Sequence, residues 1–293
     1  MLRLNTGTRA YCGSKPIRRW KVARSTVLWA AVATVVFFHA HPDDEAIATG
    51  GTMMKLADAG HRVVLVLATR GELGEVAEGF LRDGETLTER RVAETEAAAA
   101  ILGVTRVEFL GYRDSGMMGE PTNDDVEAFW RADVGEAAQR LADILRRDGA
   151  EVLVTYDDHG GYGHPDHIQV HRVGVRAAEL AGVSTVYEAT MNRDSFRRFI
   201  EAAPETDVDV AEGDTDFAET MGTAEADITT AIDVADVMDR KQAAMRAHAS
   251  QIPDDSWFFS MPEEQFTAAF GQEWYVRRGA PPRTGDFERS LLP

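Results

Sequence analysis

The sequence is poor in cysteine, with Cys12 as the single one among 293 residues. One cysteine allows neither an internal disulfide nor a thiolate metal cluster, which suits a cytoplasmic protein. Long apolar runs are also scarce. The run 27–38 is shorter than the ~20 residues that span a bilayer, so we expect no stable membrane insertion.

Basic residues are few outside the first thirty positions. Residues 1–30 hold seven Lys or Arg and no acid, which leaves 24 basic against 49 acidic side chains in residues 31–293. This excess of negative charge repels phosphate backbones and anionic lipids, so nucleic acid is not an expected partner. A neutral or cationic small molecule fits better, and a homo-oligomer stays open.

Residues 1–30 are expected to be a disordered basic leader or the product of a misplaced start codon. The basic residues up to Arg24, followed by the apolar run, also imitate a secretory signal. Cleavage after that run would remove a strand that the site needs. We therefore expect residues 31–293 to form a single domain.

From residue 34 onward, short β-branched runs alternate with longer stretches of helical periodicity. This alternation predicts an α/β fold, a Rossmann-like three-layer sandwich with a mostly parallel sheet and a C-terminal helical extension. Residues 205–230 are acidic and aperiodic and predict a loop or flap. The predicted strands are Thr34–His39, Val63–Ala68, Arg106–Leu110, Val152–Tyr156 and Thr185–Ala189. The predicted helices are Glu45–Ala59, Leu87–Leu102, Asp125–Arg147, Pro165–Leu180 and Val234–His248.

Polar segments follow four of the predicted strands, at residues 39–45, 69–72, 111–116 and 157–167. In an open parallel sheet, ligands bind beyond the carboxyl ends of the strands. The four segments are therefore expected to meet in one crevice.

The first segment contains His41-Pro42-Asp43-Asp44-Glu45 at a predicted strand-to-helix turn. Catalytic zinc takes about three nitrogen or oxygen ligands from protein and leaves one position for water. His41 and Asp44 could supply two of them, while Asp43 faces the water as a base. Aspartates after a strand also cap the following helix, so this motif alone leaves both interpretations open.

The second motif is Tyr162-Gly163-His164-Pro165-Asp166-His167. Pro165 suits the first turn of a helix, from which His167 would complete a triad with His41 and Asp44. His164 lies before the helix and is a candidate general acid or oxyanion electrophile. Asp166 could orient His164, or could simply be an acid at a helix N-terminus.

His171 stands four residues after His167, which is the spacing of a helical zinc pair. No glutamate follows His167, so the metalloprotease motif is absent. We expect His171 to support the site from outside the ligand set or to be solvated.

The two motifs resemble those of the LmbE or PIG-L family of zinc-dependent deacetylases, over about residues 33–280. The resemblance implies removal of the N-acetyl group from an N-acetylglucosamine-containing molecule. It also implies roles for residues of both motifs: metal ligands His41, Asp44 and His167, the base Asp43, and oxyanion donors Tyr162 and His164.

Further matches to the family concern the substrate. Arg91 and Asp114 occupy places where family members contact sugar hydroxyls, although an arginine on a helix is ordinarily solvated. The loop around Met221 is expected to shape the sugar pocket, and residues 246–251 match a motif that we assign to site support. Residues 46–48 are apolar where the mycothiol deacetylases carry a polar residue, which leaves the acceptor open.

Zn²⁺ is the expected cofactor, and Fe²⁺ is possible because a two-histidine, one-carboxylate face suits both ions. Two other functions remain open: an amidase that cuts a mycothiol S-conjugate, and a metal-dependent sugar-binding protein without turnover. A Mg²⁺ phosphoesterase is disfavoured, because magnesium prefers oxygen ligands.

Overall fold

The computed structural model describes residues 32–202 and 221–292. The predicted leader, and residues 205–220 of the predicted flap, lie outside the described residues. The helices of the described part are all too short or too polar to cross a bilayer.

Seven strands form one sheet in the order β3-β2-β1-β4-β5-β7-β6. The first five run parallel, whereas β7 pairs antiparallel with both β5 and β6. The predicted mostly parallel sheet is confirmed, and β6 and β7 are additions to it. The strands are β1 (Thr34–His39), β2 (Arg62–Leu67), β3 (Arg106–Phe109), β4 (Val152–Tyr156), β5 (Thr185–Thr190), β6 (Thr230–Asp233) and β7 (Gln272–Arg277).

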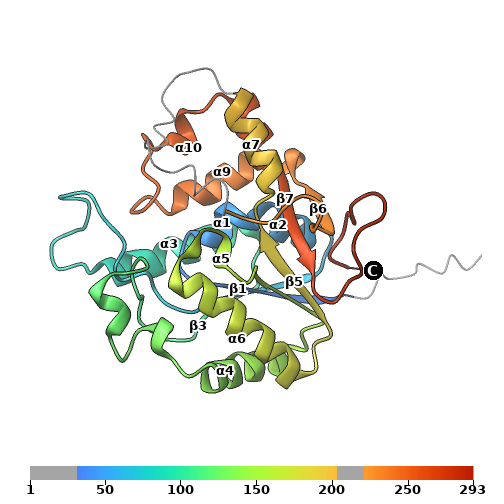
Figure 1. Cartoon of the computed structure of the whole chain (residues 1–293). Coiled ribbons are helices and arrows are strands. Elements are labelled where there is room, and N and C mark those ends of the chain that lie inside the picture. Colours follow the sequence, from blue (N-terminus) through green and yellow to red (C-terminus); the bar gives the residue numbers. More distant parts are fainter. Residues whose placement is uncertain (1–31, 203–220, 293) are drawn as a thin grey trace, which may run out of the picture. The chain divides into compact units, whose positions relative to one another are not determined.

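Helices cover both faces of this sheet (Figure 1). On one face α4 (Val134–Asp148) packs on α6 (Pro165–Ala181), and on the other α2 (Gly50–Asp58) and α9 (Met238–Ala247) pack on α3 (Leu87–Leu102). The remaining helices are shorter: α1 (Asp44–Ala48), α5 (Gly160–Gly163), α7 (Arg193–Ala202), α10 (Trp257–Ser260) and α11 (Glu263–Phe270).

Three predicted helices differ from the observed ones. The helix predicted over 45–59 breaks at Thr49, whose hydroxyl bonds to the His39 ring at 2.9 Å. The helix predicted over 125–147 begins only at Val134, because Phe129 in the preceding 3-10 turn packs edge-on against Phe38 in the core. The helix predicted over 234–248 starts at Met238, after a 3-10 turn.

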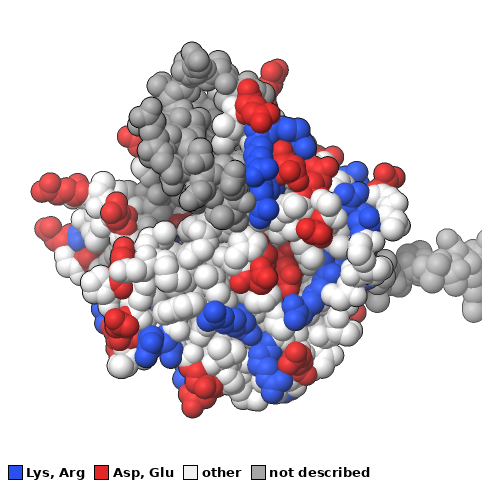
Figure 2. Space-filling view, in the orientation of Figure 1, with Lys and Arg blue, Asp and Glu red and all other residues white. Residues whose placement is uncertain are grey.

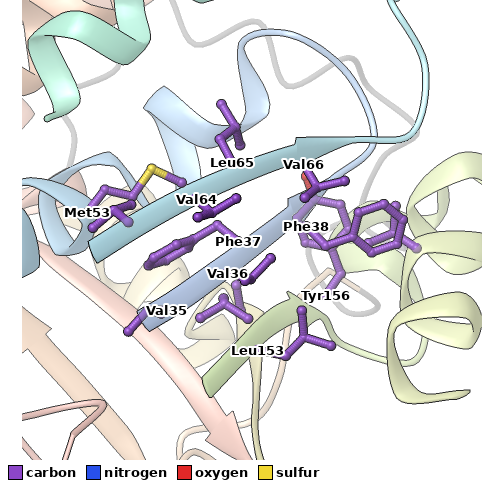
Figure 3. Packing of buried hydrophobic residues seen from close by; sticks show 14 of the residues in the cluster. Val35, Val36, Phe37, Phe38, Met53, Val64, Leu65, Val66, Leu153 and Tyr156 are labelled. Carbon is purple, nitrogen blue, oxygen red and sulfur yellow. The ribbon is translucent and has the colours of Figure 1, made fainter. Parts of the chain in front are cut away.

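The core lies where β1 runs between β2 and β4 (Figure 3). Every residue of β1 is buried, and Phe37 is surrounded by side chains of both the sheet and the helices. Strands covered on both faces read as continuous apolar runs, which is why the sequence revealed β1 clearly. The rigid strand fixes the position of the residues that follow it.

β1 and β4 are neighbours, but the chain leaves them in opposite directions, toward β2 and toward β5. Such a reversal in strand order opens a crevice at the carboxyl ends of the two strands. The two predicted motifs follow these strands directly and therefore flank the crevice.

Charged residues on the surface are mixed in sign. Figure 2 shows basic side chains next to acidic ones on the face turned to the viewer. Ion pairs such as Arg176 with Glu179 and Arg278 with Glu188 are part of this mixing.

Candidate active site

The turn after β1 is anchored by His39, the last residue of the strand. Its Nδ1 lies 2.7 Å from the Tyr156 hydroxyl and its Nε2 lies 2.9 Å from the Thr49 hydroxyl. Burial lowers the pKa of His39 to about 4, so the ring is neutral at pH 7. These contacts fix the backbone just before His41.

Asp44 lies close to both His41 and His167. Asp44 Oδ2 lies 3.4 Å from His41 Nδ1 and 3.4 Å from His167 Nε2, and it also accepts the His41 backbone N–H at 2.9 Å. Burial would raise the pKa of Asp44, but the two histidines hold it well below its usual range. The Nε2 atom of His167 is buried without a hydrogen-bond partner among the described residues.

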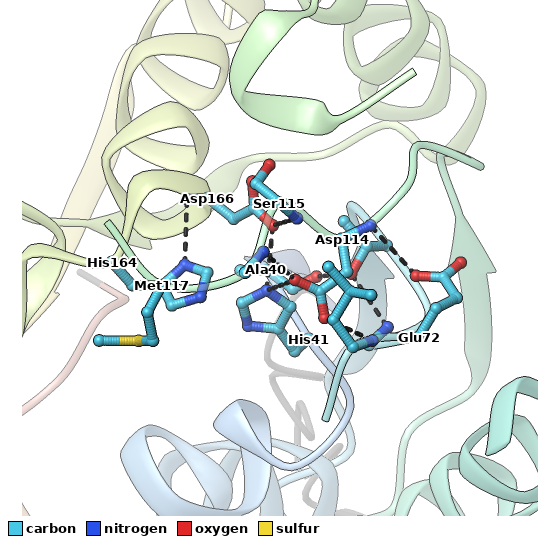
Figure 4. A network of polar contacts seen from close by, with 12 residues as sticks. Ala40, His41, Glu72, Asp114, Ser115, Met117, His164 and Asp166 are labelled. Atoms are coloured by element: carbon cyan, nitrogen blue, oxygen red, sulfur yellow. Dashed lines mark hydrogen bonds and ion pairs between the residues drawn. The ribbon is translucent and has the colours of Figure 1, made fainter. Parts of the chain in front are cut away.

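The other nitrogen of His41 faces Asp166 (Figure 4). Asp166 Oδ2 lies 3.1 Å from His41 Nε2 and accepts the Ser115 N–H at 3.0 Å, while the Ser115 hydroxyl donates to Oδ1. In the neutral ring, a carboxylate at this distance places the proton on Nε2 and leaves the lone pair of Nδ1 directed toward Asp44. Burial alone would lower the pKa of His41, but the bonds to Asp166 and Asp44 raise it, so the cluster favours a positive charge.

His164 is held by the backbone of Asp166, whose N–H donates to Nδ1 at 3.1 Å. The carboxylate of Asp166 contacts His41 and Ser115 instead, so the expected orientation of His164 by that carboxylate is not what the structure has. The reason is that the Asp166 side chain points from the first turn of α6 toward the loop at Ser115.

The protonation of His164 follows from this contact. Because Nδ1 accepts a hydrogen bond, the ring proton sits on Nε2. Burial, with His41 and His167 nearby, lowers the pKa of His164 to about 3. The ring is therefore a neutral hydrogen-bond donor and not an imidazolium acid.

Two triplets of side chains bring their ligand atoms within 4.8 Å of one another and could hold a metal ion: His41, His164 and His167, and His41, Asp114 and Asp166. His164 lacks a free lone pair in the tautomer set by its backbone contact, and Asp166 already accepts three hydrogen bonds. Asp44 stands outside both triplets but is the carboxylate nearest to both His41 Nδ1 and His167 Nε2.

Asp43 has a φ of 109° and is the single non-glycine residue with positive φ in residues 32–202 and 221–292. Its N–H donates to Glu45 Oε2 at 3.0 Å, and its Oδ2 lies 3.2 Å from Arg91 Nη2. Burial raises the pKa of Asp43 to about 6; Asp44 adds to this shift and Arg91 opposes it. The carboxylate is thus ionised at pH 7 yet holds a proton readily.

Two predicted substrate-binding residues make contacts within the chain. The buried guanidinium of Arg91 donates to the carbonyls of Pro42 and Gly71 as well as to Asp43. Asp114 accepts the N–H groups of Gly116 at 2.9 Å and of Leu73 at 3.3 Å. Binding of a sugar by these two residues stays a prediction.

Tyr162 rises from the glycine loop beside the cluster, 45% exposed and with its ring 4.9 Å from that of His167. Gly160 has a φ of +68°, and a Cβ there would lie 2.6 Å from the His167 Cβ, so only glycine fits. Partial burial and nearby carboxylates, Asp44 first, raise the pKa of Tyr162, which therefore stays a protonated donor.

Met221 lies next to the same loop. The N–H of Gly222 donates to the Gly161 carbonyl at 2.8 Å, which fixes the Met221 segment beside Tyr162. The Met221 side chain is buried, and its part in shaping a sugar pocket stays a prediction.

A cavity of about 360 Å³ opens beside Asp114, lined by Glu72, Gly111, Tyr112, Arg113 and Glu127. Glu72 lies between this cavity and the cluster of histidines and carboxylates, because its Oε2 accepts the Asp114 N–H at 3.1 Å. This space could take a second part of a ligand whose first part lies at the histidines.

Sequence reasoning gave no individual role to Ser115 or Glu45, which complete the site, and included His248 only as part of a supporting segment. Ser115 supports Asp166, while Glu45 and His248, both fully buried, contact each other at 2.6 Å directly behind Asp43. Glu45 stands in the first motif and Ser115 in the polar segment 111–116, but their partners are far away in the sequence. His248 lies in the segment 246–251 that we assigned to site support.

The chain is similar to curated enzymes over most of its length. A relative from Acidothermus cellulolyticus, "1D-myo-inositol 2-acetamido-2-deoxy-alpha-D-glucopyranoside deacetylase", is 45% identical over 270 residues, which cover 87% of this chain and 92% of the relative. An enzyme of the same name from Salinispora arenicola is 43% identical and covers 83% of each chain.

Among solved structures, the N,N'-diacetylchitobiose deacetylase of Pyrococcus horikoshii matches with a TM-score of 0.55 at 21% identity, over 83% of each chain. This likeness confirms the predicted α/β fold. The fold, the cluster of histidines and carboxylates and the curated relatives together define the class as N-deacetylases, as the sequence predicted.

The family model described as "PIG-L: GlcNAc-PI de-N-acetylase" matches residues 36–178, which include both motifs. The chain belongs to the PIG-L family.

Proposed function

We propose that the chain removes the acetyl group from the amino sugar of 1D-myo-inositol 2-acetamido-2-deoxy-α-D-glucopyranoside, with Zn²⁺ held by His41, Asp44 and His167. One observation carries the proposal: the buried His167 Nε2 has no hydrogen-bond partner among the described residues and faces Asp44 Oδ2 at 3.4 Å. A buried polar atom without a partner is costly unless a ligand satisfies it.

The donor set fits zinc. His41 offers Nδ1, because its Nε2 proton is engaged by Asp166, and such a carboxylate behind a ligand histidine is a usual support of zinc sites. Asp44 adds one charged oxygen, and the carboxylates of Asp166 and Asp44, which raise the pKa of His41, support a cation at this place. When bound, Zn²⁺ supplies an acidified water and polarises a carbonyl oxygen. Fe²⁺ would satisfy the same three donors.

Asp43 is the proposed general base. It stands next to Asp44 in the chain, but its carboxylate is turned to Arg91. A pKa of about 6 leaves it ionised at neutral pH and close to the pH at which a base works best. It takes the proton of the attacking water as the carbon–oxygen bond forms.

Tyr162 and His164 are the proposed donors to the oxyanion. Both are neutral hydrogen-bond donors, so both can stabilise the negative charge that develops on the acetyl oxygen. When the carbon–nitrogen bond breaks, the leaving amine needs a proton. Asp43 holds the proton taken from water at that stage, whereas neutral His164 could give up its one ring proton only by becoming an imidazolate, so we assign the return of the proton to Asp43.

The substrate side of the proposal rests on the relatives and on the cavity. We expect Arg91, Asp114 and Met221 to contact the amino sugar, and the cavity lined by Glu72 and Glu127 would receive the second ring. Glu72, Glu127 and Arg113 give this cavity polar walls of both signs, which suit the hydroxyl groups of an uncharged polyol. We expect the enzyme to act in the cytoplasm on this free small molecule, without nucleic acid or membrane partners, and possible self-association does not enter the proposal.

The experiment measures amine and acetate release from this substrate, from diacetylchitobiose and from a mycothiol S-conjugate, after loading with Zn²⁺ or, without oxygen, with Fe²⁺. We expect acetate from the inositol conjugate. Cleavage of the cysteinyl amide instead would make the protein an amidase. Sugar binding without turnover in fully loaded protein would make it a binding protein.

The matched variant is Asp43→Asn, which should keep the zinc content and lose about 10²–10⁴-fold in rate. If Asp43→Asn keeps full activity, the proposed mechanism is wrong.

A further inference from the structure

The backbone of Asp43 needs support. A φ of 109° with a ψ of −37° lies where residues other than glycine are rarely found. Such a conformation persists only when the surrounding structure imposes it. It also matters for the chemistry, because it separates two consecutive carboxylates: Asp44 contacts the histidines, and Asp43 contacts Arg91.

Glu45 supplies a hydrogen bond to this backbone. Its Oε2 accepts the Asp43 N–H at 3.0 Å, and its Oε1 lies 2.6 Å from His248 Nε2. Both Glu45 and His248 are fully buried. A buried carboxylate is stable only with partners for its oxygens, so His248 fixes where the Glu45 side chain lies.

Resting on the proposed function of Asp43, we infer that Glu45 and His248 are positioning residues that hold the general base in its strained conformation. The base is then held at two ends, by Glu45 at its backbone nitrogen and by Arg91 at its carboxylate. The role predicted for the segment 246–251 thereby becomes specific: His248 acts on Asp43 through Glu45.

The chain offers a matched control in the same segment. Ser250 donates its N–H to Glu94 at 3.0 Å and its hydroxyl to the same carboxylate at 2.6 Å. Ser250 and Glu94 are also buried, and they fasten this segment to α3. In the described part of the chain they make no hydrogen bond to Asp43 or Glu45, so they test how the segment docks on α3 apart from how Asp43 is positioned.

The experiment compares Glu45→Ala, His248→Ala and Ser250→Ala in the zinc-loaded enzyme. Displacement of a reacting group by about 1 Å can cost 10²-fold in rate. We expect kcat to fall by about that factor in Glu45→Ala, with KM and zinc content unchanged, and to fall less in His248→Ala. Ser250→Ala should lower the melting temperature and keep kcat.

Rescue and a mutant cycle separate positioning from folding. His248→Gln keeps a hydrogen-bond donor for Glu45 and should recover most of the kcat that His248→Ala loses. If an alanine variant fails to fold, His248→Gln still tests the inference. In the Asp43→Asn background, Glu45→Ala should have no further effect on kcat. Full kcat in Glu45→Ala, or equal losses in Ser250→Ala and His248→Ala, overturns the inference. Inactivity of the wild type on every acetamido substrate would instead overturn the proposed function.

Discussion

The replacement Asp166→Asn tests the support of the zinc ligand His41. The Asp166 carboxylate accepts three hydrogen bonds, one from His41 Nε2 and two from Ser115. Asparagine keeps an oxygen where Oδ2 accepts from His41 and from the Ser115 N–H. Its amide NH₂ then faces the Ser115 hydroxyl, which must turn. The fold and the His41 tautomer should survive, but the imidazole loses the negative charge that raises its basicity.

Loss of a carboxylate behind a ligand histidine typically costs 10–100-fold in metal affinity, which corresponds to about 1.4–2.7 kcal/mol. We expect Asp166→Asn near the lower end of this range, because the hydrogen bond to His41 remains. Asp166→Ala should fall near the upper end. Competition with a chromophoric chelator at neutral pH measures the zinc Kd of each variant directly, independently of turnover.

Asp148→Asn is the matched control, because Asp148 is also buried and accepts from Arg62 at 2.7 Å and from Arg106. It is the last residue of α4 and bonds to the first residues of β2 and β3, so it lies at the amino ends of the strands, whereas the site lies at their carboxyl ends. The control should lose stability and keep its zinc Kd. An unchanged zinc Kd in both Asp166→Asn and Asp166→Ala would refute the role that we give to Asp166.

Glu273→Ala should cost about 3–5 kcal/mol in urea unfolding, because it leaves the ammonium of Lys241 buried and unpaired; a cost below about 1 kcal/mol would contradict this. Gly160→Ala should weaken zinc binding by pushing His167 away, whereas Gly161→Ala has open space at its Cβ and should cost only the backbone strain, about 1–3 kcal/mol of stability; equal zinc Kd values would contradict the steric argument. In the metal-free protein, the free energy of unfolding of Asp43→Asn relative to the wild type should rise by up to about 3 kcal/mol in urea titrations as the pH rises from 3.8 to about 6. The sign follows from the raised pKa of Asp43 in the folded state, and a difference that does not change with pH would show that the carboxylate is not desolvated.

The central part of the fold could be predicted because its residues carry the pattern of their surroundings. β1 is apolar throughout since both of its faces are covered, and α3, with its capping box at Thr86 and Glu89, matches the predicted bounds. β7 was missed because its buried residues include Glu273, whose partner Lys241 comes from another element. The start of α4 was misplaced because Phe129 imitates a helical apolar position.

In the candidate site, too, some features could be predicted from the sequence and others could not. Both motifs could be predicted to meet, since each follows a neighbouring strand of the sheet. The partner of Asp166 could not, because Ser115 comes from the loop after β3 and its contact depends on how that loop lies over the first turn of α6. The strain at Asp43 also leaves no mark in the sequence, since nothing but the assembled surroundings forces an aspartate into positive φ.

The contact between Glu45 and His248 spans 203 positions. Proteins emerge from the ribosome with the N-terminal part first, at about 5–20 residues per second. All three proposed zinc ligands have therefore been synthesised well before α9, and a nascent chain could capture an ion while it still lacks the histidine behind its base. In cells, ion uptake and the onset of turnover would then be separate events, with the second waiting for the C-terminal quarter of the protein.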